Sequence, residues 1–263
     1  IMSDFLKNFL YFWLKQANAC FFWILLIVWM VATHYYYPID IITKYDFLFL
    51  YAFAIQWFLL YFKLESWEEA KLIMLFHIVA TAMEVFKTSV GSWNYNWEWI
   101  FMIWSVPMFA WFMYSAVWSY LMRVWRLFDF KFSNFPKLPH LYLLVTLIYL
   151  NFFTHHYIWD FRYLYFTVAL ILFWKSSIYF QVNKRYLHMP LLVWFFLVAI
   201  FIWFAENIST YLQVWTYPNQ LETWQMVSYD KILAWFLLML VSFSLVTFVQ
   251  KVDIYNHKTI KWK

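Results

Sequence analysis

Long apolar runs, separated by short stretches that hold most of the charged residues, dominate the pattern of this chain. A helix that crosses a membrane needs about 20 consecutive apolar residues. In lipid each run must be helical, because its backbone amides have no water to bond. The pattern therefore predicts an all-α membrane protein with about eight transmembrane helices. We place these helices at residues 18–33, 47–62, 68–86, 99–122, 138–153, 161–180, 189–212 and 230–249.

Composition supports a membrane protein and removes several kinds of chemistry. Hydrophobic residues make up 66% of the 263 positions and charged residues 13%, which is more apolar surface than one soluble core could bury. The single cysteine, Cys20, excludes an intramolecular disulfide framework and a thiolate metal cluster. Residues 1–17 are aromatic and sparsely charged, and no small-residue cleavage site follows them, so we expect an interfacial segment rather than a cleaved signal.

The distribution of Lys and Arg orients the predicted helices. If both termini lie in the cytoplasm, 15 of the 19 basic residues fall on the cytoplasmic side, including those of a basic tail at 251–263. This bias indicates a multi-pass membrane protein with both termini in the cytoplasm and with the lipid bilayer as its partner. The basic residues are scattered over several loops, so we expect no nucleic-acid partner.

Two segments of the chain match each other in composition and spacing. They are "EVFKTSVGSWNY" from Glu84 and "ENISTYLQVWTY" from Glu206, which start 122 positions apart. Shorter matches flank them in the same order: "THYYY" with "THHYI", "DFLFL" with "DFRYL", and "AWF" with "AWF". We interpret the pattern as two four-helix repeats, 18–130 and 131–250. Four helices is an even number, so the repeats should be parallel and related by a pseudo-two-fold axis along the membrane normal.

The matched polar residues all fall at the predicted outer ends of the helices. A carboxyl group in such apolar surroundings is a candidate acid, so we take Glu84 and Glu206 as the catalytic residues. Around them we expect a substrate-binding set of His77, Thr88, Trp93, Tyr95, Asn207, Thr210, Trp215 and Tyr217. A supporting polar cluster is expected from His34, Asp46, Lys87, Asn151, His155, His156 and Asp160.

Simpler explanations exist for each of these groups. Glu84 is one turn from Lys87 and would then be a structural carboxylate paired with it, while Glu206 would anchor one helix to another. The Trp and Tyr residues would belong to an interfacial aromatic belt. His34, His155, His156 and the two aspartates could gather a metal, but no spacing among them is diagnostic. We therefore expect no metal and no cofactor.

Several long motifs carry a resemblance to a known family. "NFFTHH", "WRLFDF", "MEVFKTSVGSWNY", "IWFAENIST" and "WFLLMLVSFSLVTFV" resemble the bacterial multispan family called domain of unknown function 817, over roughly residues 45–250. That resemblance implies a fold family and a location in the bacterial inner (cytoplasmic) membrane, but no activity. The series Glu84, Trp93, Tyr95 and Pro107 is also similar to a pattern in membrane carotenoid cyclases and hydratases. Ser228 and Tyr229 stand where the second repeat would need the proline, so this second pattern is incomplete there.

Glycine is unusually rare. The chain has 1 glycine beside 20 tryptophans, whereas glycine is normally about 7% of a protein. Trp104, Trp111 and Trp118 recur every seven residues, where closely packed membrane helices favour small residues. One hypothesis is that the encoding genome reads UGA as glycine, so that these tryptophans are translation artefacts. The alternative is an AT-rich genome with real aromatic packing.

Three classes of function remain open. An enzyme would use Glu84 or Glu206 to protonate an isoprenoid or other hydrophobic small molecule, while aromatic faces stabilise the carbocation. A transporter would bind protons or a cation on the same carboxylates. A structural protein would dock a partner on its outer face. The inner halves of the predicted helices are nearly all apolar, apart from Gln56, Lys175, Ser176 and Ser177, which favours the enzyme over transport.

Overall fold

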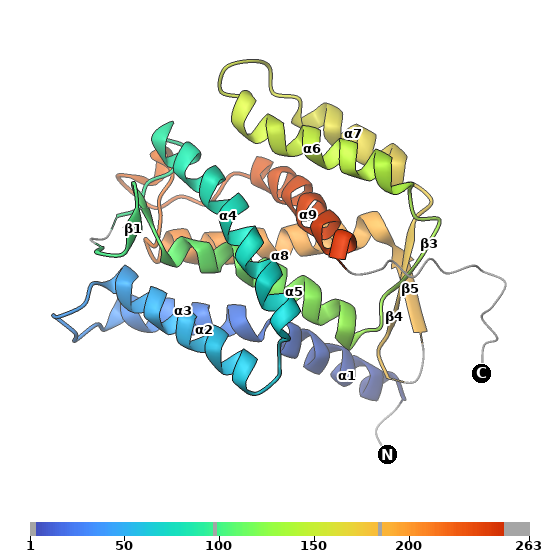
Figure 1. Ribbon diagram of the computed structural model, residues 1–263, viewed down its shortest axis with the longest axis horizontal. Helices are drawn as coiled ribbons and strands as arrows, with labels where there is room; N and C mark the ends of the chain where they lie inside the picture. The colour runs from blue at the N-terminus through green and yellow to red at the C-terminus, as the bar shows by residue number, and fades with distance from the viewer. Residues whose placement is uncertain (1–3, 97–98, 184–185, 250–263) are drawn as a thin grey trace. The chain divides into compact units, whose positions relative to one another are not determined.

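The computed structural model describes residues 4–96, 99–183 and 186–249, and this part of the chain is mostly helical (Figure 1). It contains nine α-helices and five short strands. The helices are α1 (Asp4–Ala19), α2 (Phe21–Tyr35), α3 (Lys44–Tyr61), α4 (Trp67–Ser89), α5 (Phe109–Leu127), α6 (Leu138–Thr154), α7 (Arg162–Phe173), α8 (Leu191–Tyr211) and α9 (Asp230–Val249). The strands are β1 (Met102–Ile103), β2 (Val106–Pro107), β3 (Lys131–Ser133), β4 (Ser177–Gln181) and β5 (Tyr186–Pro190), and a 3₁₀ turn covers Pro218–Gln220.

Fewer of the described helices are long and apolar enough to cross a membrane than the sequence predicts. Within the described ranges, α4, α8 and α9 are long and apolar enough to cross a membrane. The pair α1 and α2, bent by 68°, would add a fourth if it forms one broken span. Helices do occupy each of the eight predicted ranges at least in part, but α6 and α7 are shorter apolar helices. The prediction of eight spans therefore remains a prediction.

The all-α prediction is wrong in two places, where the chain forms small antiparallel sheets. The predicted helix 99–122 begins only at Phe109, because residues 102–107 form the β1–β2 hairpin. The predicted helix 161–180 ends at Phe173, and β4 then pairs with β3 on one side and β5 on the other. Strand pairing satisfies backbone groups that a helix would otherwise satisfy, so both segments keep their polar backbone atoms bonded.

The chain divides into two compact units, which we describe separately. Unit 1 comprises residues 4–19, 121–203 and 228–249, and unit 2 comprises residues 20–120 and 204–227, less the undescribed positions inside those ranges. These units do not coincide with the predicted repeats 18–130 and 131–250, whose existence as a duplication stays a prediction.

Unit 1 is built on aromatic packing. Helices α6, α7 and α9 pack together, and the sheet β3–β4–β5 lies next to the start of α6 and the end of α7 (Figure 1). Trp125, Phe132, Phe195 and Phe243 are buried and meet ring to ring, with centroids of Trp125 and Phe132 4.9 Å apart. Such ring pairs, which range from stacked to edge-to-face, add specific contacts to simple burial of apolar area.

Unit 2 contains α2, α3, α4, the first part of α5 and the end of α8. Side-chain caps define the starts of two of its helices, α3 and α4. The Thr43 side chain accepts from the Asp46 backbone N–H at the start of α3, and Ser66 and Glu69 form a capping box at the start of α4. Tyr45, which follows in α3, is fully buried and lies 5.8 Å from the ring of Tyr95.

The three spaced tryptophans differ in their surroundings. Trp104 opens the two-residue turn between β1 and β2 with φ of 51°, the left-handed conformation in which hairpins favour glycine. The indole nitrogens of Trp111 and Trp118 are buried with no hydrogen-bond partner among the described residues, which is costly for a polar group. By contrast, Trp93 donates its indole N–H to Glu84. The backbone at Trp104 is thus suited to glycine, while the decoding hypothesis for positions 104, 111 and 118 stays a prediction.

Trp104→Gly is therefore expected to raise the free energy of unfolding by about 1 kcal/mol, because glycine removes the left-handed backbone strain. Thermal unfolding of the purified variants measures this, with Trp93→Gly as the control that should lose stability. Peptide mass spectrometry on protein from the native cells gives the direct answer. Tryptophan found at 104, 111 and 118 would rule out the decoding hypothesis.

Candidate functional site

Glu84 is the centre of a buried polar cluster in unit 2. It lies in the last two turns of α4, and only 2% of its surface is exposed. Its Oε1 accepts from the Tyr114 hydroxyl at 2.5 Å, and its Oε2 accepts from Trp93 Nε1 at 3.0 Å and from the Tyr95 hydroxyl at 2.9 Å. Three donors on one carboxylate stabilise its ionised form, whereas burial favours its neutral form.

Glu206 repeats part of this arrangement. It lies near the end of α8, is 3% exposed, and accepts from the hydroxyl of Tyr217. Tyr217 follows Glu206 by eleven positions, as Tyr95 follows Glu84. The two glutamate–tyrosine pairs that the sequence matched therefore make the same hydrogen bond.

The two loops that carry these tyrosines are joined at equivalent positions. Asn94 and Thr216, which are also 122 positions apart, form an antiparallel bridge in which each backbone N–H donates to the other's carbonyl oxygen at 2.9 Å. Such a reciprocal bridge has local two-fold symmetry. It brings Trp93 and Tyr217 together, with ring centroids 6.4 Å apart. The two carboxylate clusters therefore adjoin each other within unit 2.

The tyrosines remain hydrogen-bond donors at physiological pH. Burial, followed by the charge of Glu84, raises the pKa of Tyr95 well above the usual value near 10. Burial and the charge of Glu206 raise the pKa of Tyr217 in the same way, and the charge of Glu84 contributes as well. A raised pKa in the folded state stabilises the fold below about pH 10, and this stabilisation is lost as pH rises further.

Other residues of the expected binding set lie on the same unit with different partners. Thr88 bonds the Glu84 carbonyl and lies 3.1 Å from the Ser105 hydroxyl. Thr210 accepts from Trp224 Nε1 at 3.2 Å. Asn207 accepts from the Val227 backbone N–H at 2.9 Å, so it also fixes the loop that precedes α9. Trp215 lies beside the Glu206 cluster and bonds Tyr217.

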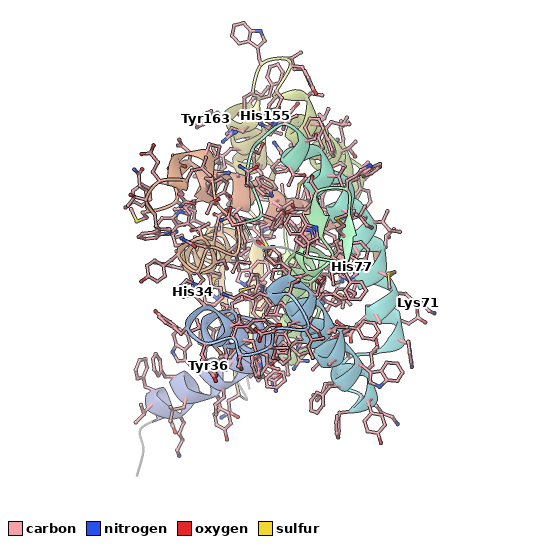
Figure 2. The ribbon with its side chains drawn as sticks, turned by 90° about the vertical axis from the view of Figure 1, so that its left-hand side faces the viewer. His34, Tyr36, Lys71, His77, His155 and Tyr163 are labelled. Carbon is pink, nitrogen blue, oxygen red and sulfur yellow. The ribbon has the colours of Figure 1, made fainter. Side chains whose placement is uncertain are left out.

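His77 lies two turns before Glu84 on α4 and is 6% exposed. Its Nδ1 lies 3.1 Å from the carbonyl oxygen of Trp111 and therefore carries the proton of that bond. Figure 2 shows the contrast along this helix, where Lys71 extends away from the ribbon while His77 lies among other side chains. Lys87, expected as the partner of Glu84, is buried on the same helix, and its pairing with Glu84 stays a prediction.

The expected supporting cluster is divided between the units. In unit 2, His34 Nδ1 bonds the Leu212 carbonyl, and Asp46 accepts from the backbone N–H groups of Ile100 and Phe101 at 2.7 Å each. In unit 1, Asn151 Nδ2 donates to Asp160, and the rings of His155 and His156 lie 4.1 Å apart. Among the described residues, no group of three or more His, Cys, Asp or Glu side chains could hold a metal ion.

Sequence reasoning missed two tyrosines of the site. Tyr114 of α5 donates to Glu84, and the Tyr45 hydroxyl donates to the Val214 carbonyl and accepts from the Asn96 N–H at 3.1 Å. Tyr45 is adjacent to the matched residue Asp46, which was a usable signal. At the 124-position offset of the matching "AWF" segments, the counterpart of Tyr114 is Leu238. A search for repeated polar residues could therefore not find Tyr114.

Comparisons with known proteins place the chain among uncharacterised proteins. A family model described as "Protein of unknown function (DUF817)" matches residues 8–243. The uncharacterised protein YoaT of Bacillus subtilis (strain 168) is 36% identical over 247 residues, which covers 94% of this chain and 93% of that protein. No solved structure matches the chain.

Proposed function

This chain belongs to the DUF817 family of unknown function, and we propose that it is a proton-translocating membrane transporter in which Glu84 and Glu206 bind and release the proton. The observation that carries the proposal is the pair of buried carboxylates, each bonded to a tyrosine eleven positions later and linked through the Asn94–Thr216 bridge. Ionisable groups inside a membrane protein are costly and typically mark ion pathways and proton relays.

Transport also requires a membrane-crossing architecture. We propose that all eight helices α2–α9 span the bacterial inner membrane, with both termini in the cytoplasm and α1 at the interface. The proposed parallel repeats would then place Glu84 and Glu206 around one axis, as in transporters built from two related halves. The symmetric pairing of the two loops supports this arrangement.

In the sequence, the apolar inner halves of the predicted helices favoured an enzyme over a transporter. The structure weakens this argument against transport. The end of α4 remote from Glu84 has its own buried carboxylate, Glu65, which is 3% exposed and hydrogen-bonded to Gln56 and Ser119. A proton path through the membrane needs a polar group at that end of α4. A site confined to the outer face does not need one.

Proton uptake into vesicles tests the proposal. The protein is reconstituted with a pH-sensitive dye inside, and a membrane potential, negative inside, drives protons inward. We expect uptake by the wild type and at least a tenfold loss in Glu84→Gln and in Glu206→Gln, since an amide cannot carry the proton. Glu222→Gln, at an exposed position in the loop after Tyr217, is the matched control and should behave as the wild type. Wild-type uptake no greater than that of empty vesicles would contradict the proposal.

An acid–base enzyme for a hydrophobic small molecule is the second candidate. The observation in its favour is the ring of aromatic donors, Trp93, Tyr95 and Tyr114, around Glu84, because aromatic faces stabilise carbocations. Mass spectrometry of lipids that copurify with the protein distinguishes the two. An isoprenoid-like molecule retained by the wild type and altered in Glu84→Gln would favour the enzyme, and bulk phospholipid alone would favour transport.

A further inference from the structure

Buried ionisable groups follow α4 from one end to the other. Glu65 precedes the helix by two positions, His77 lies near its middle and Glu84 lies near its end, and these three side chains are 3%, 6% and 2% exposed. Exposed charges also occur at the start of the same helix, where Glu68 pairs with Lys71 and its side chain is 77% exposed. Burial therefore separates the three groups from ordinary surface charges.

Each of the three groups is held by α5. Ser119 donates to Glu65 Oε1, the Trp111 carbonyl accepts from His77, and Tyr114 donates to Glu84. All these residues belong to unit 2, so the row is internal to one compact unit. A helix rises 1.5 Å per residue, so Glu65 and Glu84 lie roughly 25 to 30 Å apart along α4. This separation is close to the thickness of the hydrocarbon core, about 30 Å.

His77, in the middle of the row, has a ring nitrogen that can accept a proton. His77 donates a hydrogen bond from Nδ1 to the Trp111 carbonyl oxygen, so in the neutral ring Nε2 is the accepting nitrogen. An accepting nitrogen on a side chain that is more than nine-tenths buried is suited to take a proton in transit.

The Glu65 end can hold its carboxyl group in either protonation state. Gln56 Nε2 donates to Glu65 Oε2 at 2.6 Å, while Gln56 Oε1 is buried without a partner among the described residues. Turning the amide over would present Oε1 to a protonated Glu65 as an acceptor, and Nε2 serves the ionised form. Glu69, the neighbouring buried carboxylate, accepts from the Ser66 N–H at 2.6 Å in the capping box. That role in the helix cap accounts for Glu69 but not for Glu65.

We propose that Glu65, with Gln56 and Ser119, is a second proton-binding site, and that His77 relays protons between Glu65 and Glu84 along the α4–α5 contact. This inference rests on the proposed function and extends it from one site to a path. The intervals between the three groups exceed a single hydrogen bond, so bridging water is required in each interval.

The test combines proton uptake with a second measurement on the Glu84 cluster. Reconstituted Glu65→Gln and His77→Phe should each take up protons at least tenfold more slowly than the wild type, and Glu65→Asp should recover part of the rate. Glu68→Gln, on the exposed side of the same helix, is the matched control and should keep the wild-type rate. Infrared spectra of each variant report whether the carboxyl signal that disappears in Glu84→Gln is still present. If this signal is present, the Glu84 cluster is intact.

The possible results separate the path from the proposed function. Slow uptake with an intact Glu84 signal supports the path. If Glu84→Gln blocks uptake but Glu65→Gln and His77→Phe match the control, the path is wrong and the proposed function stands. If slow uptake in these variants accompanies loss of the Glu84 signal, Glu65 and His77 only support the fold. If the wild type shows no uptake, the proposed function fails and the path fails with it.

Discussion

Replacing Glu84 by leucine is expected to destabilise the protein by about 3 to 6 kcal/mol. Leucine fills a similar volume but accepts no hydrogen bond, so Tyr114, Tyr95 and Trp93 each lose their acceptor at this site. A buried donor left without an acceptor costs about 1 to 3 kcal/mol. Three such donors therefore give one of the largest effects that a single substitution can have in this chain.

Thermal unfolding in detergent measures this effect, and we expect the midpoint to fall on the order of 10 °C. Glu68→Leu on the same helix is the control. Its side chain is exposed and makes one surface ion pair with Lys71, so its substitution should change stability by no more than about 0.5 kcal/mol. Equal midpoints for Glu84→Leu and Glu68→Leu would show that the aromatic donors do not depend on Glu84.

Glu84 and Glu206 are expected to share one proton at neutral pH rather than titrate independently. The Asn94–Thr216 bridge and the contact between the rings of Trp93 and Tyr217 bring the two carboxylate clusters together, and both carboxylates are buried. Two carboxylates in such a site repel each other when both are ionised, so one of them retains a proton. Removing either carboxylate relieves the repulsion and leaves the other ionised by its tyrosine donors.

The paired clusters could be predicted from the sequence because the segments from Glu84 and Glu206 match in residue type and spacing. Glu84, Tyr95, Glu206 and Tyr217 stand at one constant offset, and the structure gives both pairs the same glutamate–tyrosine hydrogen bond. The positions of most helices were equally visible, since each is a long apolar run bounded by charge. What remains a prediction is that all of them cross the membrane.

The small sheets could not be predicted in the same way. Strand β4 has five residues, and its apolar positions Ile178, Tyr179 and Phe180 are consecutive, so it lacks the alternation that would indicate a half-buried strand. The hairpin β1–β2 turns at Trp104, whose side chain hides the preference for glycine at that position.

Burial of single charged residues was also beyond the sequence. The segment "KLESWEEAK" is typical of a solvated loop, yet Glu65 and Glu69 are buried while Glu68 is exposed. The difference depends on Gln56 and Ser119, which lie 9 and 54 positions away from Glu65. Contacts at such distances along the chain are decided by packing, which local composition does not record.

Infrared spectroscopy of the carboxyl groups at neutral pH tests most directly whether Glu84 and Glu206 share a proton. The spectra are compared for the wild type, Glu84→Gln, Glu206→Gln and Glu222→Gln. We expect the wild type and Glu222→Gln to show one protonated carboxyl group in apolar surroundings, and both other variants to lose it. A protonated carboxyl signal that disappears in only one of Glu84→Gln and Glu206→Gln, or that is absent from the wild type, would contradict a proton shared by the pair.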